Sequence, residues 1–108
     1  MPSLEEILNE IKAEGFETVR TNFMDLLAAT KDDSEEMAWR TAQKIERWLI
    51  LLAQGDLDTE EFDHLIKARE RVVREYMNTL EIKARTRLEK TVIALIEIAI
   101  EKVIPHLV

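Results

Sequence analysis

The sequence predicts an all-α protein, and three observations carry the prediction. Glycine and proline occur only twice each in 108 residues, whereas an all-β fold needs a turn about every 8–12 residues. Glu, Leu, Ala, Lys and Arg, which favour helices, are abundant. Apolar residues recur at intervals of three and four along most of the chain, the spacing of one helix face. We therefore expect one helical domain over residues 1–108, built of antiparallel helical hairpins or a bundle.

The first helix is expected over about residues 4–30. Ser3 is followed three residues later by Glu6, the spacing of a capping box at a helix start. Two apolar stripes follow, and Gly15 lies between them. A glycine inside a helix costs about 1 kcal/mol relative to alanine, so we expect a kink or a short break at this residue.

The second helix is expected over about residues 34–54. Asp32 or Asp33 can cap its start, and Gly55 has the position of a left-handed residue at its end. The chain then turns directly into a third helix that begins at residue 59.

The start of the third helix has the strongest local signal in the chain. Asp58 and Glu61 have capping-box spacing, and Leu57 and Phe62 can form the hydrophobic contact that accompanies such a cap. With Gly55 just before them, these residues predict a tight antiparallel hairpin.

Residues 45–67 resemble the helical hairpin of the SHOCT (short C-terminal domain) family. In that family leucines precede a glycine, after which an apolar residue, a cap and an acidic run lead into phenylalanine. The matching residues here are Leu49, Leu52, Gly55, Leu57, Asp58, Glu60, Glu61 and Phe62. The hairpin here is internal and its second helix continues much farther. The resemblance implies an oligomerisation or interaction role, and it implies no chemistry.

The third helix is expected to be very long, because residues 59–104 contain neither glycine nor proline before Pro105. At 1.5 Å per residue, one helix over this range would be about 69 Å long. The alternative is a break near Asn78, since Asn78 and Glu81 repeat the capping-box spacing. Such a break would allow a compact four-helix monomer.

A continuous third helix predicts association between chains. Its part beyond about residue 80 would extend past the other helices, and that part is the most apolar in the chain. A helix that is apolar nearly all round must be buried on more than one side, and two-fold pairing is the commonest solution. We therefore predict a homo-oligomer, a dimer or tetramer, with this interface: Leu88, Val92, Leu95, Ile96, Ala99, Ile100, Val103 and Ile104.

Charge is distributed unevenly in a chain whose net charge is −7. Residues 67–90 hold 8 basic and 4 acidic side chains, and Lys83, Arg87 and Lys90 share a helix face. We expect this stretch to face acidic helices of the same or a neighbouring chain. The alternative is a patch that binds an anionic ligand or nucleic acid, although the acidic isoelectric point of about 4.9 weighs against nucleic acid.

The sequence predicts no enzyme and no cofactor. There is no cysteine, and the paired carboxylates stand at expected helix starts, where they complement the helix dipole. Glu61 and His64 have the spacing used by di-iron helical bundles, but such a site needs a second pair and further glutamates. They are the candidate ligands of an alternative, carboxylate-bridged metal protein. We assign Trp39 and Trp48 to packing, with ligand stacking as the alternative.

The expected function is a non-enzymatic, homo-oligomeric structural or protein-interaction module in the cytoplasm. The first six residues lack the pattern of a signal peptide. The most apolar stretch, residues 92–104, contains three charged residues and is too short to span a membrane. The two alternatives are an anion or nucleic-acid binder through residues 67–90 and the metal protein using Glu61 and His64.

Overall fold

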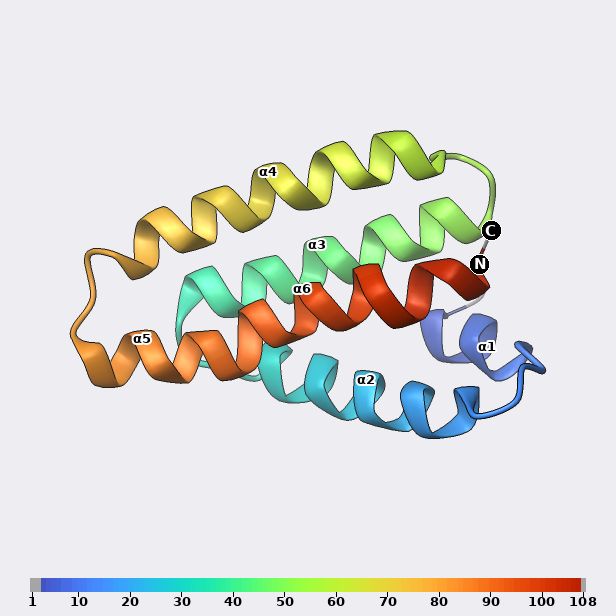
Figure 1. The fold of residues 1–108 in the computed structure, drawn as a ribbon, viewed down its shortest axis with the longest axis horizontal. Helices are drawn as coiled ribbons and strands as arrows, with labels where there is room; N and C mark the ends of the chain where they lie inside the picture. Colours follow the sequence, from blue (N-terminus) through green and yellow to red (C-terminus); the bar gives the residue numbers. More distant parts are fainter. Residues whose placement is uncertain (1–2, 108) are drawn as a thin grey trace.

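The computed structural model describes residues 3–107, and within this range the chain is helical with no strand. Four helices precede a C-terminal helix of 25 residues over 82–106 (Figure 1). The first four are α1 (Leu4–Asn9), α2 (Phe16–Lys31), α3 (Glu36–Ala53) and α4 (Thr59–Met77). The C-terminal helix contains α5 (Ile82–Leu88), a π-helical segment (Glu89–Ile93), α6 (Ala94–Ile98), a second π-helical segment (Ala99–Val103) and a last 3-10 turn (Ile104–His106). The all-α prediction is confirmed.

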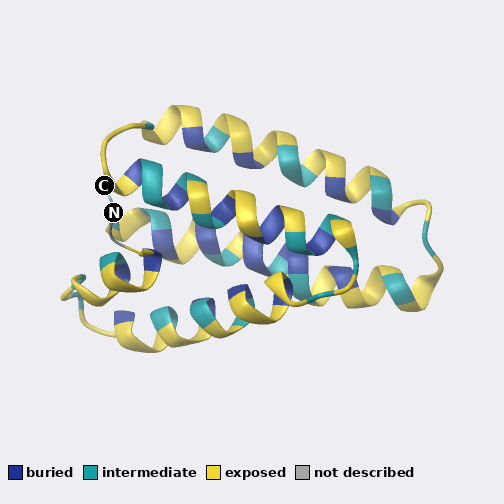
Figure 2. Ribbon diagram, turned by 180° about the vertical axis from the view of Figure 1, so that it is seen from behind, coloured by how far each residue is buried: buried dark blue, intermediate teal, exposed yellow. Residues whose placement is uncertain are grey.

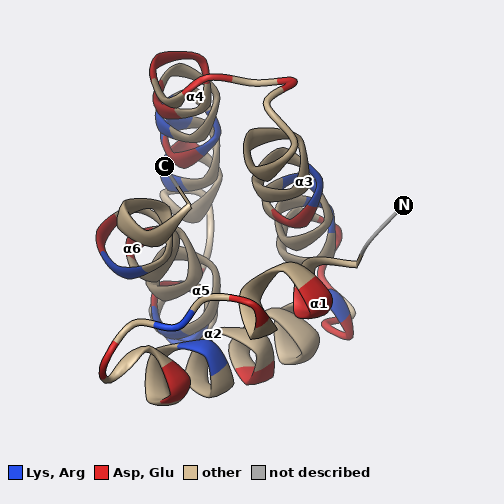
Figure 3. Cartoon of the chain, turned by 90° about the vertical axis from the view of Figure 1, so that its right-hand side faces the viewer, with Lys and Arg blue, Asp and Glu red and all other residues tan. Residues whose placement is uncertain are grey.

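The helices form a bundle around one core. Seen along the long axis, α2, α3, α4 and the C-terminal helix surround the interior, and α1 lies beside α2 and α3 (Figure 3). The C-terminal helix contacts both α2 and α3. Each helix turns a buried side inward, with most exposed residues on the outside (Figure 2). The largest fully buried side chains include Phe16, Phe23 and Phe62.

The first expected helix is interrupted at the predicted place, and the interruption is wider than a kink. Helix α1 ends at Asn9 and α2 begins at Phe16. Gly15 adopts φ = 79°, in the left-handed region that favours glycine. The cap predicted at the start of α1 forms, because the Glu6 N–H donates to the Ser3 hydroxyl at 3.2 Å.

The hairpin between α3 and α4 has the predicted geometry. Gly55 adopts φ = 81° after α3. The Glu61 N–H donates to the Asp58 carboxylate at 2.7 Å, and the Asp58 N–H donates to the Glu61 carboxylate at 3.0 Å. Both halves of the capping box are therefore formed, and Phe62 is completely buried just after them.

The expectation of one helix over 59–104 is wrong, because the chain turns back after Met77. Asn78 ends α4, and the next helix begins at Ile82 with Glu81 extended before it. The alternative, a break near Asn78, is thus confirmed, but Asn78 lies at the end of a helix and does not cap the start of the next one. The turn is held by short-range hydrogen bonds: the Thr79 hydroxyl donates to the carbonyl of Tyr76 at 2.7 Å, and the Leu80 N–H donates to the carbonyl of Met77 at 3.0 Å.

The reversal places the predicted oligomer interface inside the chain. Six of its eight residues are completely buried, and Ile100 and Ile104 pack partly buried against the same core. The six are Leu88, Val92, Leu95, Ile96, Ala99 and Val103. Folding back buries this apolar surface without a second copy, and burial of such side chains stabilises by about 1.5–3 kcal/mol each. The reason for expecting an interface at these residues therefore no longer holds.

Tyr76 joins the end of α4 to the start of α3. Its hydroxyl donates a hydrogen bond to a carboxylate oxygen of Glu35. This hydrogen bond, then burial, and then the negative charges of Glu35 and Glu36 raise the pKa of Tyr76 above its ordinary value of 10.0. The native state thus holds the phenolic proton more firmly than the unfolded chain does.

We expect the ionisation of Tyr76 to have a midpoint above pH 10.0. Tyr76 is the single tyrosine, so an alkaline titration followed by ultraviolet absorbance reports it alone. Because the folded pKa is raised, this group's contribution to stability is lost as pH rises from about 10 through the folded pKa. Glu35→Gln removes the charge and should lower the midpoint. A native midpoint at or below that of the urea-unfolded chain would contradict the contact.

No helix among the described residues combines the length and the apolar composition that crossing a bilayer requires.

Candidate binding surface on helix α3

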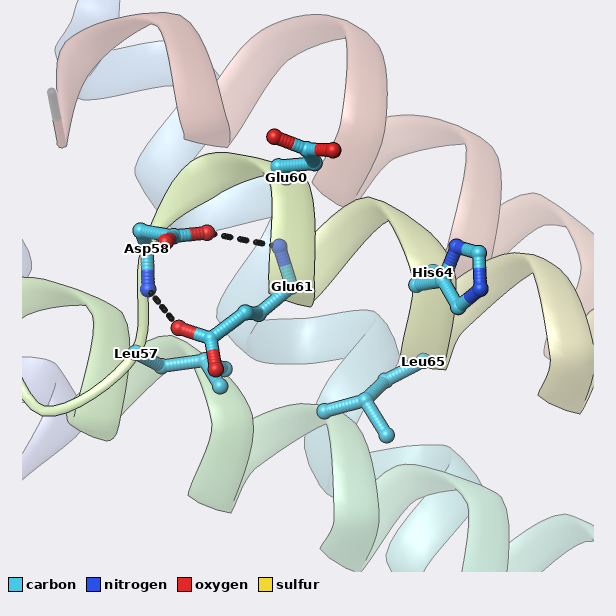
Figure 4. A pocket seen from close by; sticks show the side chains of 6 residues that line it. All are labelled: Leu57, Asp58, Glu60, Glu61, His64 and Leu65. Atoms are coloured by element: carbon cyan, nitrogen blue, oxygen red, sulfur yellow. Dashed lines mark hydrogen bonds between the residues drawn. The ribbon is translucent and has the colours of Figure 1, made fainter.

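Glu61 and His64 do not come together as a metal site. The Glu61 carboxylate turns back to the Asp58 N–H, whereas His64 lies one turn farther along α4 (Figure 4). Both residues line a hollow of about 580 Å³, together with Leu57, Asp58, Glu60 and Leu65. Within residues 3–107, no group of three or more His, Asp or Glu side chains is placed to hold a metal ion. Glu61 therefore acts as part of a helix cap.

The predicted anion patch is partly engaged within the chain. Arg87 forms an ion pair with Asp33, whose side chain is only 9% exposed, and so ties the C-terminal helix to the turn between α2 and α3. Lys83 and Lys90 are exposed. Elsewhere in the basic stretch 67–90, Arg74 binds Glu70 at 3.0 Å and approaches Glu89 at 3.8 Å. The contact of Arg87 with Asp33 agrees with the expectation that the stretch faces acidic side chains elsewhere in the chain, whereas both partners of Arg74 lie within the stretch itself.

A different basic surface lies on α3, and the sequence reasoning missed it. One hollow of about 350 Å³ is lined by Trp39, Arg40, Gln43, Lys44 and Arg47. A second hollow of about 330 Å³ adjoins it, sharing Gln43 and Arg47. We call the two hollows together the α3 surface; it comprises Trp39, Arg40, Gln43, Lys44, Glu46, Arg47, Ile50 and Leu51.

Helical spacing explains why these residues share a side of α3. Arg40, Lys44 and Arg47 stand at positions i, i+4 and i+7, which fall on one helix face. Ile45 and Leu49, on the opposite side, are completely buried. Lys and Arg on α3 lie along its outer edge, away from α6 (Figure 3). Packing of the core therefore presents three cations to solvent in a row.

The positive charge of the α3 surface is little compensated. Arg40 pairs with Glu36 at 3.0 Å, but both side chains are more than half exposed, and such pairs contribute little. Among the described residues, neither Lys44 nor Arg47 has an ion pair. Glu46, the one acidic residue of the surface, is engaged by Lys31 of α2 at 2.8 Å. The surface is thus locally basic in an acidic protein.

The two tryptophans of α3 have different surroundings. Trp48 is partly buried and packs against the core, as predicted. Trp39 is also partly buried, but it is not among the described side chains that pack against the core. Its ring lies 5.5 Å from the guanidinium carbon of Arg40, within the range of a cation–π contact. The aromatic ring of Trp39 therefore lines the hollow of about 350 Å³.

A fourth cation borders this surface from α4. The Arg69 guanidinium donates to the Thr41 hydroxyl at 2.9 Å and to the Met37 sulfur at 3.4 Å. No carboxylate of the described chain pairs with it. Burial, and then the charge of Arg40, lower the pKa of Arg69. An anion placed near Arg40 and Arg69 would reduce their mutual repulsion.

The sequence did contain a signal for the α3 surface. The spacing of Arg40, Lys44 and Arg47 is visible, but residues 1–66 hold 6 basic and 16 acidic side chains, and that excess concealed a local cluster. The position of Trp39 outside the core has no comparable signal, because it depends on how the helices pack together.

Comparisons of the chain with protein-family models, curated proteins and solved structures found no match. The SHOCT resemblance of residues 45–67 therefore stays a prediction, and any functional argument must come from the surface itself.

Proposed function

We propose that the chain is a non-enzymatic protein-interaction module that binds its partner through the α3 surface. The observation that carries the proposal is the placement of Trp39 outside the core, beside three cations and two hollows. Tryptophan and arginine are the side chains most enriched among residues that dominate binding energy at protein interfaces.

Two further features support a binding role over catalysis. Arg69 and Tyr76, whose pKa values are shifted, both use their polar groups to join α4 to α3 or to the residue before it. The acidic residues around His64 include Asp58 and Glu61, which already bind each other's backbone N–H groups. These contacts commit both carboxylates to the cap of α4.

The homo-oligomer expected from the sequence has a direct test. Its interface residues lie inside the chain, so we expect a single-chain mass of 12.6 kDa by light scattering coupled to size exclusion, over a range of concentrations. Twice this mass, abolished by Trp39→Ser with Arg47→Ser, would make a second copy the partner of the α3 surface. Twice this mass, retained in that variant, would place self-association elsewhere.

The proposed function is tested by selecting binders from a random-peptide display library. Each selected peptide is added to the nitrogen-15-labelled protein, and amide shifts locate its binding site. We expect the shifts to lie on the outer side of α3, and Trp39→Ser with Arg47→Ser to weaken binding by about 30-fold or more, the scale of a hot-spot loss.

The matched control is Arg71→Ser, an exposed arginine of α4 with no ion pair among the described residues. It should leave binding unchanged. Binders that shift amides away from α3, or that bind the Trp39/Arg47 variant as tightly as the native protein, would refute the proposal.

A further inference from the structure

Resting on the proposed function, we infer that the α3 surface binds an acidic amphipathic helix of a protein partner, laid along α3. The surface is straight, because Arg40, Lys44 and Arg47 follow one helix over seven residues, about 10 Å along the axis. A second helix has the same pitch, so carboxylates spaced at three and four residues would meet the cations in register.

The unpaired cations of the α3 surface predict negative charge on the partner. Lys44 and Arg47 have no carboxylate partner in the described chain, and Arg40 has only the exposed Glu36. Arg69 adds a cation at the border with α4. Carboxylates of a partner would supply the missing charge, and such pairs chiefly set orientation and exclude wrong partners.

Apolar side chains at both ends of the cation row define the rest of the partner. Trp39 lies at one end, and Ile50 and Leu51 lie at the other. Trp39 and Ile50 are eleven residues apart, about 16 Å along α3, or three helical turns. An amphipathic helix that lies in such a site uses apolar anchors at i, i+3, i+4 and i+7. The partner should therefore have apolar anchors flanked by carboxylates over about three turns.

A nucleic acid fits this surface less well. Its charges continue beyond the cation row at close, regular spacing, where they would meet Glu36 and the acidic N-terminal half of the chain. A helix with a few carboxylates places negative charge only opposite the cations. The net charge of −7 therefore opposes a polyanion much more than it opposes a short acidic helix.

The test uses the peptides from the display selection that bind at α3. We expect them to be enriched in Asp and Glu at three- and four-residue spacing, and to become helical on binding by far-ultraviolet circular dichroism. Replacing their carboxylates by amides should weaken binding about 10-fold or more, and raising the salt concentration should weaken the acidic peptide more than its amide version.

Reversing the charge of the α3 surface gives the most direct test. The variant Lys44→Glu with Arg47→Glu should no longer bind the acidic peptide. It should instead bind a version of that peptide in which Lys replaces each acidic residue. The control variant Lys83→Glu with Lys90→Glu makes the same change in net charge on another surface, and it should bind the acidic peptide about as the native protein does.

Three outcomes would overturn the inference: selected peptides with no acidic excess, an amide version that binds equally well, or a single-stranded oligonucleotide that binds the α3 surface more tightly than any acidic peptide. Non-acidic peptides that still map to α3 would end the inference and leave the proposed function standing. An α3 surface that selects no peptide would end both.

Discussion

We expect the substitution Ile96→Glu to unfold the protein at neutral pH. Ile96 is completely buried near the middle of the C-terminal helix. Ile96 belongs to the buried apolar cluster, and burial of an unpaired charge costs several kcal/mol. That cost is comparable with the whole stability of a typical domain, about 5–15 kcal/mol. Far-ultraviolet circular dichroism and denaturant titration measure the loss.

The matched control is Ile82→Glu, in the first turn of the same helix, where the side chain is 76% exposed. An acidic residue near a helix start is favourable, so its stability should stay within about 0.5 kcal/mol of the native value. If Ile96→Glu kept its helical signal and only changed the mass in solution, the residue would belong to an interface between chains, and the packing described above would be wrong.

Phe62→Ala is expected to destabilise the protein by about 3–5 kcal/mol, the range found for a fully buried phenylalanine. Phe62 is completely buried, just after the capping box that begins α4. Its removal leaves a cavity where α4 meets the rest of the bundle. The shift of the urea midpoint at constant slope gives the change in the free energy of unfolding.

Leu65→Ala, three residues farther along α4, is the control, because Leu65 is 37% exposed. It should cost much less, about 1 kcal/mol or below. Equal losses at Phe62 and Leu65 would show that the difference in their burial does not set the cost, contrary to the structure.

Local signals in the sequence were sufficient for two helix starts, whereas α3 begins after Glu35 and not after the expected cap, Asp32 or Asp33. The capping pairs Ser3/Glu6 and Asp58/Glu61 act over three residues, so their sequence spacing already fixes the backbone contacts that the structure shows. Gly15 and Gly55 were informative for the same reason, since each adopts a left-handed backbone conformation that few other residues tolerate.

The reversal after Met77 depends on packing between distant parts of the chain. Residues 78–81 contain neither glycine nor proline, and their hydrogen bonds are those of an ordinary turn. The apolar segment from Leu88 to Val103 decides the outcome, because turning back buries it against α2 and α3. Helical periodicity cannot distinguish one long helix from two, since both have the same spacing.

The candidate surface was hidden for a related reason. The sequence shows which residues share the outer side of α3, but not how far its neighbours cover that side. Trp39 and Trp48 lie on one helix, yet only Trp48 packs against the core. The position of Trp39 outside the core is therefore a property of the assembled bundle.

The packing of the C-terminal helix against both α2 and α3 has a consequence for biosynthesis. Helices α1–α4 leave the ribosome first, and at that stage the inward sides of α2 and α3 lack the helix that covers them. A nascent chain at that stage exposes apolar surface of the kind that chaperones recognise and that aggregates when many copies accumulate. The native fold therefore requires that residues 82–106 have left the ribosome. We expect a chain that stops before them to be degraded rather than to form a smaller folded domain.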